Sequence, residues 1–208
     1  MDNDFDIITM YMIVLPIIFG VMAAFFLIIG MRGIITKRPF LVSNKWLLWM
    51  MSIVFVPLIC QPLFFYPPDI GLLGWLNPAL YIVVLVMMFI ALKGYVAYGV
   101  TDMSFREALL AALDKLQLPH EETLSIIRLT SLDTYLQVSV QSWVGAGQIK
   151  IKQREQRAQL AEIVREMNVH FQISSAAANL TSCIFFVVTG VLMVVGGIGV
   201  VFLFQNIG

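Results

Sequence analysis

The chain has 208 residues, of which 60% are hydrophobic and only 12% are charged, and its formal net charge is zero. Its mean hydropathy is +0.88. Soluble domains carry about 25% charged residues, so this composition excludes an ordinary soluble protein and predicts an integral membrane protein. The balance of charge also disfavours nucleic acid as a partner.

Four apolar stretches are long enough to cross a bilayer as helices, because a hydrocarbon core of about 30 Å needs about 20 helical residues. They run from Ile7 to Met31, from Trp46 to Tyr66, from Pro78 to Val100 and from Ala176 to Phe204. Lys93 lies in the last third of the third stretch, where its long side chain can bring the ammonium to the headgroups. The sequence therefore predicts four transmembrane helices.

Positive charge predicts the orientation of these helices. The loop between the first two stretches holds four basic residues, namely Arg32, Lys37, Arg38 and Lys45. The N-terminal tail and the loop from Pro67 to Asn77 hold none, and basic loops stay in the cytoplasm. We therefore expect a plasma (inner) membrane protein with both termini outside. The chain begins with aspartates rather than positive charge, so we expect the first stretch to stay in the mature protein.

A segment of mixed composition interrupts the apolar chain at residues 101–172, which we expect to form a cytoplasmic domain between residues 1–100 and residues 173–208. Asp102 or Ser104 can cap a first helix that ends before Pro119, and an apolar stripe runs along it through Phe105, Leu109, Leu113 and Leu116. Alternating apolar and polar residues then predict strands at Glu122–Thr130, Thr134–Trp143 and Gly147–Gln153.

Helical spacing returns from Arg154, and no proline or glycine separates this helix from the fourth span, so it could run on without a break. The predicted fold is thus an α-helical integral membrane protein with four transmembrane helices and a small α+β (α-β-β-β-α) cytoplasmic domain. An alternative makes Glu121–Leu129 a helix and leaves a hairpin.

Glu162, Glu166 and His170 are spaced by four residues on the last cytoplasmic helix and so share one face. Two carboxylates and an imidazole are suitable ligands for a divalent metal. The simpler interpretation is a solvated helix face, which we favour because no fourth ligand is evident. His120, beside two glutamates, directly follows Pro119 at the start of a predicted strand, so we expect a loop or turn role for it rather than a catalytic one.

Lys150, Lys152 and Arg154 alternate along the last predicted strand, with Arg157 nearby. Such a stripe could bind anionic lipid headgroups or a partner, or could be a charged strand edge that prevents unwanted pairing. In the fourth span, small residues that permit close helix contact are Gly190, Gly196, Gly197 and Gly199.

No familiar hydrolase, nucleotide or paired-cysteine metal motif occurs in the sequence, so we predict no catalytic residue and no cofactor. We expect a non-enzymatic accessory, assembly or scaffold subunit of a larger membrane protein complex, whose partners are the lipid bilayer and other membrane subunits or further copies of the chain. One alternative is an oligomeric channel or lipid-handling protein with Gln61 and Ser52 along its path. Another is a membrane enzyme with a metal site at the cytoplasmic face.

Overall fold

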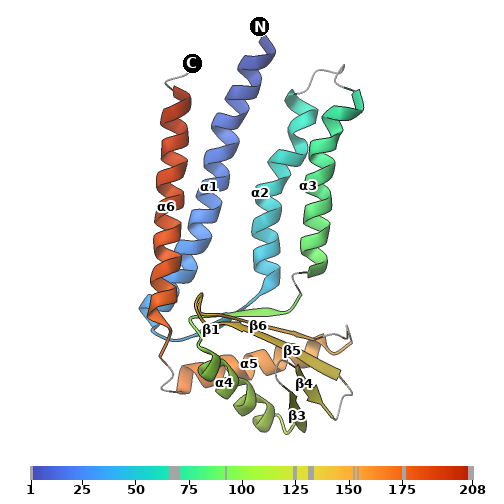
Figure 1. Cartoon of the computed structure of the whole chain (residues 1–208), viewed down its shortest axis with the longest axis vertical. Coiled ribbons are helices and arrows are strands. Elements are labelled where there is room, and N and C mark those ends of the chain that lie inside the picture. Colours follow the sequence, from blue (N-terminus) through green and yellow to red (C-terminus); the bar gives the residue numbers. More distant parts are fainter. Residues whose placement is uncertain are drawn as a thin grey trace. The chain divides into compact units, whose positions relative to one another are not determined.

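A computed structural model of the chain describes residues 2–65, 71–91, 93–123, 126–130, 134–151, 153, 155–174 and 177–205. The protein is mostly helical and has one antiparallel sheet (Figure 1). It divides into two compact units. We call the first the helix bundle, which comprises Met1–Leu27, Lys45–Leu92 and Val188–Gly208. We call the second the sheet domain, which comprises Ile28–Asn44 and Lys93–Val187.

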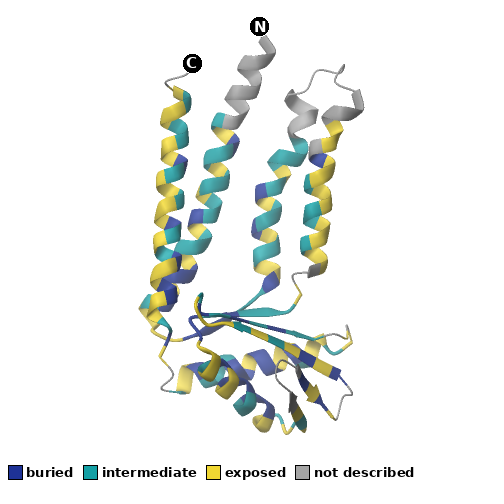
Figure 2. Ribbon diagram, viewed as in Figure 1, coloured by how far each residue is buried: buried dark blue, intermediate teal, exposed yellow. Residues whose placement is uncertain are grey.

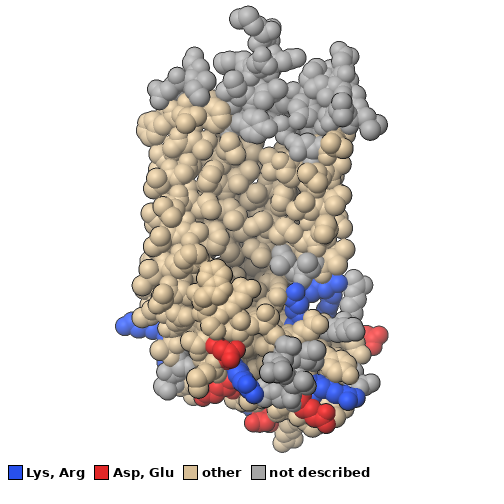
Figure 3. All heavy atoms as spheres, in the orientation of Figure 1, with Lys and Arg blue, Asp and Glu red and all other residues tan. Residues whose placement is uncertain are grey.

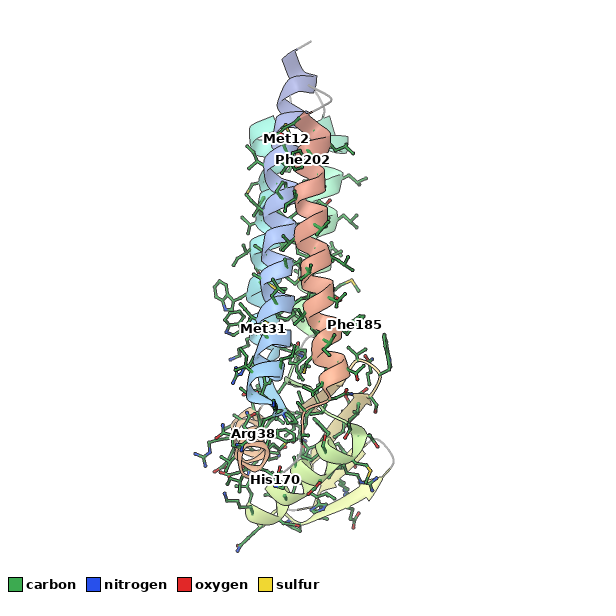
Figure 4. All side chains as sticks on the ribbon, turned by 90° about the vertical axis from the view of Figure 1, so that its left-hand side faces the viewer. Met12, Met31, Arg38, His170, Phe185 and Phe202 are labelled. Carbon is green, nitrogen blue, oxygen red and sulfur yellow. The ribbon has the colours of Figure 1, made fainter. Side chains whose placement is uncertain are left out.

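Four helices contribute to the helix bundle: α1 (Asp2–Thr36), α2 (Asn44–Phe65), α3 (Gly71–Ala91) and α6 (Leu180–Gln205). The last turns of α1 and the first turns of α6 belong to the sheet domain. Within the bundle, α1 and α6 run antiparallel and side by side, as both Figure 1 and Figure 4 show. The pair α2 and α3 is joined by a ring contact between Phe55 and Tyr81, whose centroids lie 5.7 Å apart.

The bundle exposes apolar side chains and carries little charge. Figure 2 shows exposed and half-buried residues along all four helices, whereas fully buried residues gather in the sheet domain. Only Asp2, Asp4, Asp6, Lys45 and Asp69 among the charged residues fall within the bundle. On the face drawn in Figure 3, no described charged side chain interrupts the apolar surface of its helices.

Two helical segments of the described residues, Met12–Thr36 and Leu180–Gln205, are long and apolar enough to cross a membrane. In the most apolar window of each, 17% of the residues are buried. The apolar segments described in α2 and α3 are shorter, at Asn44–Cys60 and Pro78–Ile90. The structure thus contains two candidate membrane helices.

The predicted third span was wrong at its C-terminal end. Helix α3 ends at Ala91, and the residues that follow form strand β2 (Tyr95–Tyr98). Gly94, with a positive φ of 99°, lies between them. A Cβ at this position would overlap the Ile149 carbonyl oxygen, so the close approach requires glycine. Lys93 consequently belongs to the sheet domain and is exposed.

The sheet has six antiparallel strands rather than the three expected, in the order β1-β2-β6-β5-β4-β3. The other five strands are β1 (Phe40–Ser43), β3 (His120–Thr123), β4 (Ile126–Leu129), β5 (Thr134–Gln141) and β6 (Ala146–Ile151). The predicted α-β-β-β-α order was therefore incomplete. Strand β1 comes from the predicted first loop, and it pairs with β2 in the register Leu41↔Ala97.

The predicted strand Glu122–Thr130 is instead a hairpin of two short strands. His120 pairs with Leu129 and Thr123 pairs with Ile126, so β3 folds back on β4. The alternative helix over Glu121–Leu129 was wrong as well. Thr130 donates its backbone N–H to the Pro119 carbonyl at 3.0 Å, and this bond closes the base of the hairpin.

Helices α4 (Asp102–Lys115) and α5 (Arg157–Ile173) cover one face of the sheet and close the core (Figure 1). The N-cap of α4 is Thr101 rather than the predicted Asp102 or Ser104. Thr101 and Ser104 form a reciprocal capping box, in which each side chain bonds the other residue's backbone N–H. The side chains that are essentially inaccessible at the centre of the core are Phe105, Leu109, Leu113, Leu136, Ile149, Ile163, Met167 and Phe171.

The predicted continuous helix from the domain into the fourth span was also wrong. Helix α5 ends at Ile173 and α6 starts at Leu180. The side-chain carbonyl oxygen of Asn179 accepts a hydrogen bond from the backbone N–H of Ser182 at 3.3 Å and so caps α6. Asparagine and serine bond nearby backbone groups in this way, which favours helix ends over helix interiors.

Candidate functional site

A cavity of about 320 Å³ lies between α4 and α5 in the sheet domain, and we call it the α4–α5 groove. Its apolar lining comes from Ala111, Ala112, Val169 and Ile173. Its polar lining comes from Lys115, Glu166, His170 and Ser174. Ile173 is 79% exposed, so the groove opens to the surface beside an apolar side chain that the core does not use.

The position of the groove follows from the spacing of residues on α5. Leu160, Ile163, Val164 and Met167 face the core at helical intervals. Glu166, His170 and Ile173 follow each other by four and three residues and therefore share an adjacent face. The small side chains Ala111 and Ala112 leave space opposite that face. A groove results because large residues on α5 face small residues on α4.

Glu166 anchors the polar end of the groove through two cations. Its side chain is 9% exposed, and its carboxylate oxygens lie 2.6 Å from Lys115 Nζ and 3.2 Å from Arg165 Nη2. Contact with the Lys115 ammonium, followed by the weaker effect of Arg165, lowers the pKa of Glu166 although burial opposes this shift. The ion pair thus joins α4 to α5 at neutral pH.

His170 presents a polar atom whose hydrogen-bonding capacity is unused. Its Nε2 is buried and has no hydrogen-bond partner among the described residues. The nearest carboxylate oxygen, Glu107 Oε1, is 4.0 Å away, which is too far for a hydrogen bond. A bound group inside the groove could supply the missing partner.

The three predicted metal ligands lie along α5 but enter different contacts. Glu162 is 47% exposed and lies 3.9 Å from Arg165, Glu166 pairs with Lys115, and His170 faces Glu107. In the part of the chain that the structure describes, no three His, Cys, Asp or Glu side chains come close enough to share a metal ion. The metal site stays a prediction that these contacts do not favour.

The predicted basic stripe is described only in part, because Lys152 and Arg154 lie outside the described residues. Lys150 alternates with the buried Ile149 and so lies on the sheet face opposite α4 and α5. Arg157 is exposed at the start of α5. The role of the basic stripe stays a prediction.

His120, the other histidine of the sequence, lies at the start of β3, and its Nδ1 is 3.2 Å from the Leu118 carbonyl oxygen.

Of the glycines predicted for packing, three lie against α1 within the bundle. A Cβ at Gly190 would lie 2.7 Å from Leu27 Cγ, and a Cβ at Gly197 would lie 3.1 Å from Phe19 Cβ. Gly196 also faces Phe19, whereas Gly199 has no atom within 4 Å. The helix pair therefore uses this stripe for close contact within the chain.

Sequence reasoning missed the matching glycines on α1, which lie in the sheet domain. A Cβ at Gly30 would lie 2.7 Å from the Cys183 carbonyl oxygen and 2.8 Å from the Val187 nitrogen. One at Gly33 would overlap the Cys183 sulfur. A pair of glycines three residues apart at the end of an apolar stretch is the signal that could have identified this contact.

These features define the class of the protein: a mostly helical chain with a small antiparallel sheet and, among the described residues, two helices long and apolar enough to span a membrane. No protein-family model, curated protein or solved structure matches the chain.

Proposed function

We propose that this protein is a non-enzymatic accessory, assembly or scaffold subunit of a larger complex in the plasma (inner) membrane. In this proposal all four helices α1, α2, α3 and α6 cross the bilayer, both termini lie outside, and the sheet domain lies in the cytoplasm as a platform for a partner. The observation that carries the proposal is the division between an apolar bundle with few charges and a charged domain with its own core.

The exposed side chains of the bundle support its placement in lipid. Large apolar residues are more than half exposed on each of the four helices, for example Ile13, Trp49, Met87 and Leu192. Water would disfavour such a surface by about 25 cal/mol per Å² of apolar area, whereas lipid accepts it. Charged residues would be costly on the same surface, and the five in the bundle lie in the first two turns of α1, in the first turn of α2 or between α2 and α3.

The orientation rests on the cationic residues near the ends of α1 and α2. Arg32, Lys37, Arg38 and Lys45 lie around the connection between these helices. The bundle carries only aspartates in its N-terminal tail and between α2 and α3. The positive-inside rule then assigns the α1–α2 connection, and the sheet domain that includes it, to the cytoplasm.

The α4–α5 groove supports a docking role for the sheet domain. An apolar floor beside an unsatisfied polar atom, His170 Nε2, fits an apolar side chain of a partner segment followed by a polar group. The Lys115–Glu166 ion pair would hold the two walls of the groove together while the partner binds. A partner subunit with an exposed amphipathic helix offers this chemistry.

Co-purification from the native membrane tests the proposal. Gentle detergent extraction of a tagged chain should recover a partner in constant stoichiometry, and Ile173→Lys should reduce that recovery at least tenfold. Ala158→Lys is the matched control, because position 158 is also exposed on α5 but does not line the groove. A chain that purifies alone and moves a solute or lipid in liposomes would contradict the proposal and favour the channel or lipid-handling alternative.

A further inference from the structure

Three segments of the sheet domain converge on the residues that begin α6. The Lys37 carbonyl accepts the backbone N–H of Ala178 at 3.0 Å, and the Gly99 carbonyl accepts that of Asn179 at 2.9 Å. The Asn179 side-chain amide donates to the Ser142 carbonyl in the β5–β6 turn at 3.4 Å. A Cβ at Gly145 in the same turn would overlap the Ser182 side chain. The β5–β6 turn is therefore fixed beside the first residues of α6.

The sequence of α6 shows where the hydrocarbon layer would begin on this helix. Thr181 and Ser182 are polar, and from Cys183 onward the helix is apolar for the roughly 20 residues that a bilayer core requires. Gly33 of α1 packs against Cys183, so Arg32 lies close to the same level. The Arg32 guanidinium sits 4.5 Å from the centre of the Phe40 ring, and a long arginine side chain at this level can bring its charge to the headgroups. Ser182 and Cys183 thus mark the boundary.

Trp143 is held at this boundary and has no role in the core. It is 79% exposed at the second position of the turn Ser142–Gly145. The backbone around it is fixed, because Val144 N–H bonds the Gln141 carbonyl at 3.1 Å and Gly145 N–H bonds the Ser142 carbonyl at 3.2 Å. Val100 N–H bonds the Gly145 carbonyl at 3.1 Å. A rigid turn that presents an exposed indole favours contact with a layer that is part apolar and part wet.

From this juxtaposition we propose that Trp143 inserts into the headgroup layer of the cytoplasmic leaflet and docks the sheet domain on the phospholipid surface. The inference rests on the proposed membrane span of α6. Indole rings concentrate at membrane interfaces, where the ring is buried and the N–H stays hydrated. Lys37 and Arg38 are exposed on the segment that also contacts Ala178, and their charge suits anionic headgroups. The dock would limit rotation of the sheet domain against the membrane.

Fluorescence of a chain with one tryptophan tests the inference. Trp46→Phe, Trp49→Phe and Trp75→Phe leave Trp143 as the sole indole. The chain is reconstituted into vesicles of phosphatidylcholine and phosphatidylglycerol, with lipids brominated either near the glycerol end or near the methyl end of the acyl chain. Trp143 should emit at shorter wavelength than in water and lose at least half of its emission to the shallow bromines. It should lose much less to the deep bromines.

Two matched variants, made in a background that also carries Trp143→Phe, separate the possible failures. Tyr135→Trp places an indole on β5 about 25 Å along the strand from the turn, and bromine should quench it less than it quenches Trp143. Val194→Trp places one within α6, and the deep bromines should quench it. If Val194→Trp is quenched but Trp143 behaves like Tyr135→Trp, the dock is wrong and the span stands. If the deep bromines do not quench Val194→Trp, α6 does not span the bilayer, and the proposed function fails together with the dock that rests on it.

A simpler variant keeps the inference testable if the triple substitution misfolds. Trp143→Phe in the otherwise native chain should remove a component of emission that shallow bromines quench. Equal quenching of the native chain and Trp143→Phe would overturn the inference.

Discussion

Gly33 of α1 and Cys183 of α6 lie so close together that a Cβ on residue 33 would overlap the cysteine sulfur. One turn away, Gly30 faces the backbone of Cys183 and Val187 in the same way. In lipid, where apolar burial does not drive helices together, such close approach supplies packing contacts between helices. The ends of α1 and α6 that enter the sheet domain therefore pack closely because Gly30 and Gly33 have no side chain to separate the two helices.

Gly30→Ala should destabilise the protein by about 1–3 kcal/mol, because the new methyl group meets backbone atoms of α6 that cannot rotate away. Gly20→Ala is the matched control on the same helix, since no atom lies within 4 Å of its Cβ position. Alanine favours a helix over glycine by about 0.5–1 kcal/mol, so the control should be neutral or stabilised. Equal unfolding temperatures of the two variants in detergent would argue against the close contact.

Asn179→Ala should cost about 0.5–2 kcal/mol, because it removes the N-cap of α6 together with the bond to the Ser142 carbonyl. Asn179→Asp retains an oxygen for the Ser182 N–H but has no amide to donate to Ser142. Chemical denaturation should rank the native chain above the aspartate variant and the alanine variant lowest. An alanine variant as stable as the native chain would show that the α5–α6 break does not depend on this cap.

Glu166→Gln should weaken the sheet domain in a way that depends on pH. The lowered pKa means that the native ion pair stabilises fully above the ordinary value of 4.5 and is lost as the pH falls through the lower folded-state value. The gap in unfolding temperature between the native chain and Glu166→Gln should thus be widest near neutral pH and close below pH 4.5. Arg165→Gln should have a smaller effect, since its side chain is 70% exposed and its contact with Glu166 is longer. A gap that stays constant with pH would contradict the role of the Lys115–Glu166 pair.

The local parts of the sheet domain could be predicted from sequence. The apolar stripe of Phe105, Leu109 and Leu113 indicated α4, and all three residues are buried. The alternation that includes Leu136 and Val138 indicated β5, and both pack in or against the core. Each of these signals lies within about ten residues, where helical and strand periods differ clearly.

The remaining strands depend on pairing between distant residues. Phe40–Ser43 looked like part of a loop, and Tyr95–Tyr98 like the end of a membrane span, because both are short and largely apolar. They become strands because they pair with each other and because Tyr95–Tyr98 also pairs with β6. Periodicity within one short segment cannot reveal such pairing. The Asn179 cap, in contrast, could have been predicted from the sequence, because an asparagine directly precedes an apolar helical stretch.

For the candidate site, the sequence identified Glu166 and His170 as members of one helix face but could not identify the opposite wall. Lys115 and the two alanines of α4 reach the same cavity only because α4 packs on α5. The ion pair at 2.6 Å that occupies Glu166 joins residues 51 positions apart. The sequence of α5 alone left Glu166 available as a metal ligand. In the structure its carboxylate is instead paired with the Lys115 ammonium of α4.

In the proposed topology the sheet domain lies in the cytoplasm while the C-terminus lies outside. Cysteine labelling in sealed cells tests this topology, in a background with Cys60→Ala and Cys183→Ala. Gln137→Cys on the exposed face of β5 should react with a membrane-impermeant maleimide only after the cells are opened. A cysteine added after Gly208 should react in intact cells. Labelling of Gln137→Cys in intact cells, or protection of the C-terminal cysteine, would overturn the proposed topology.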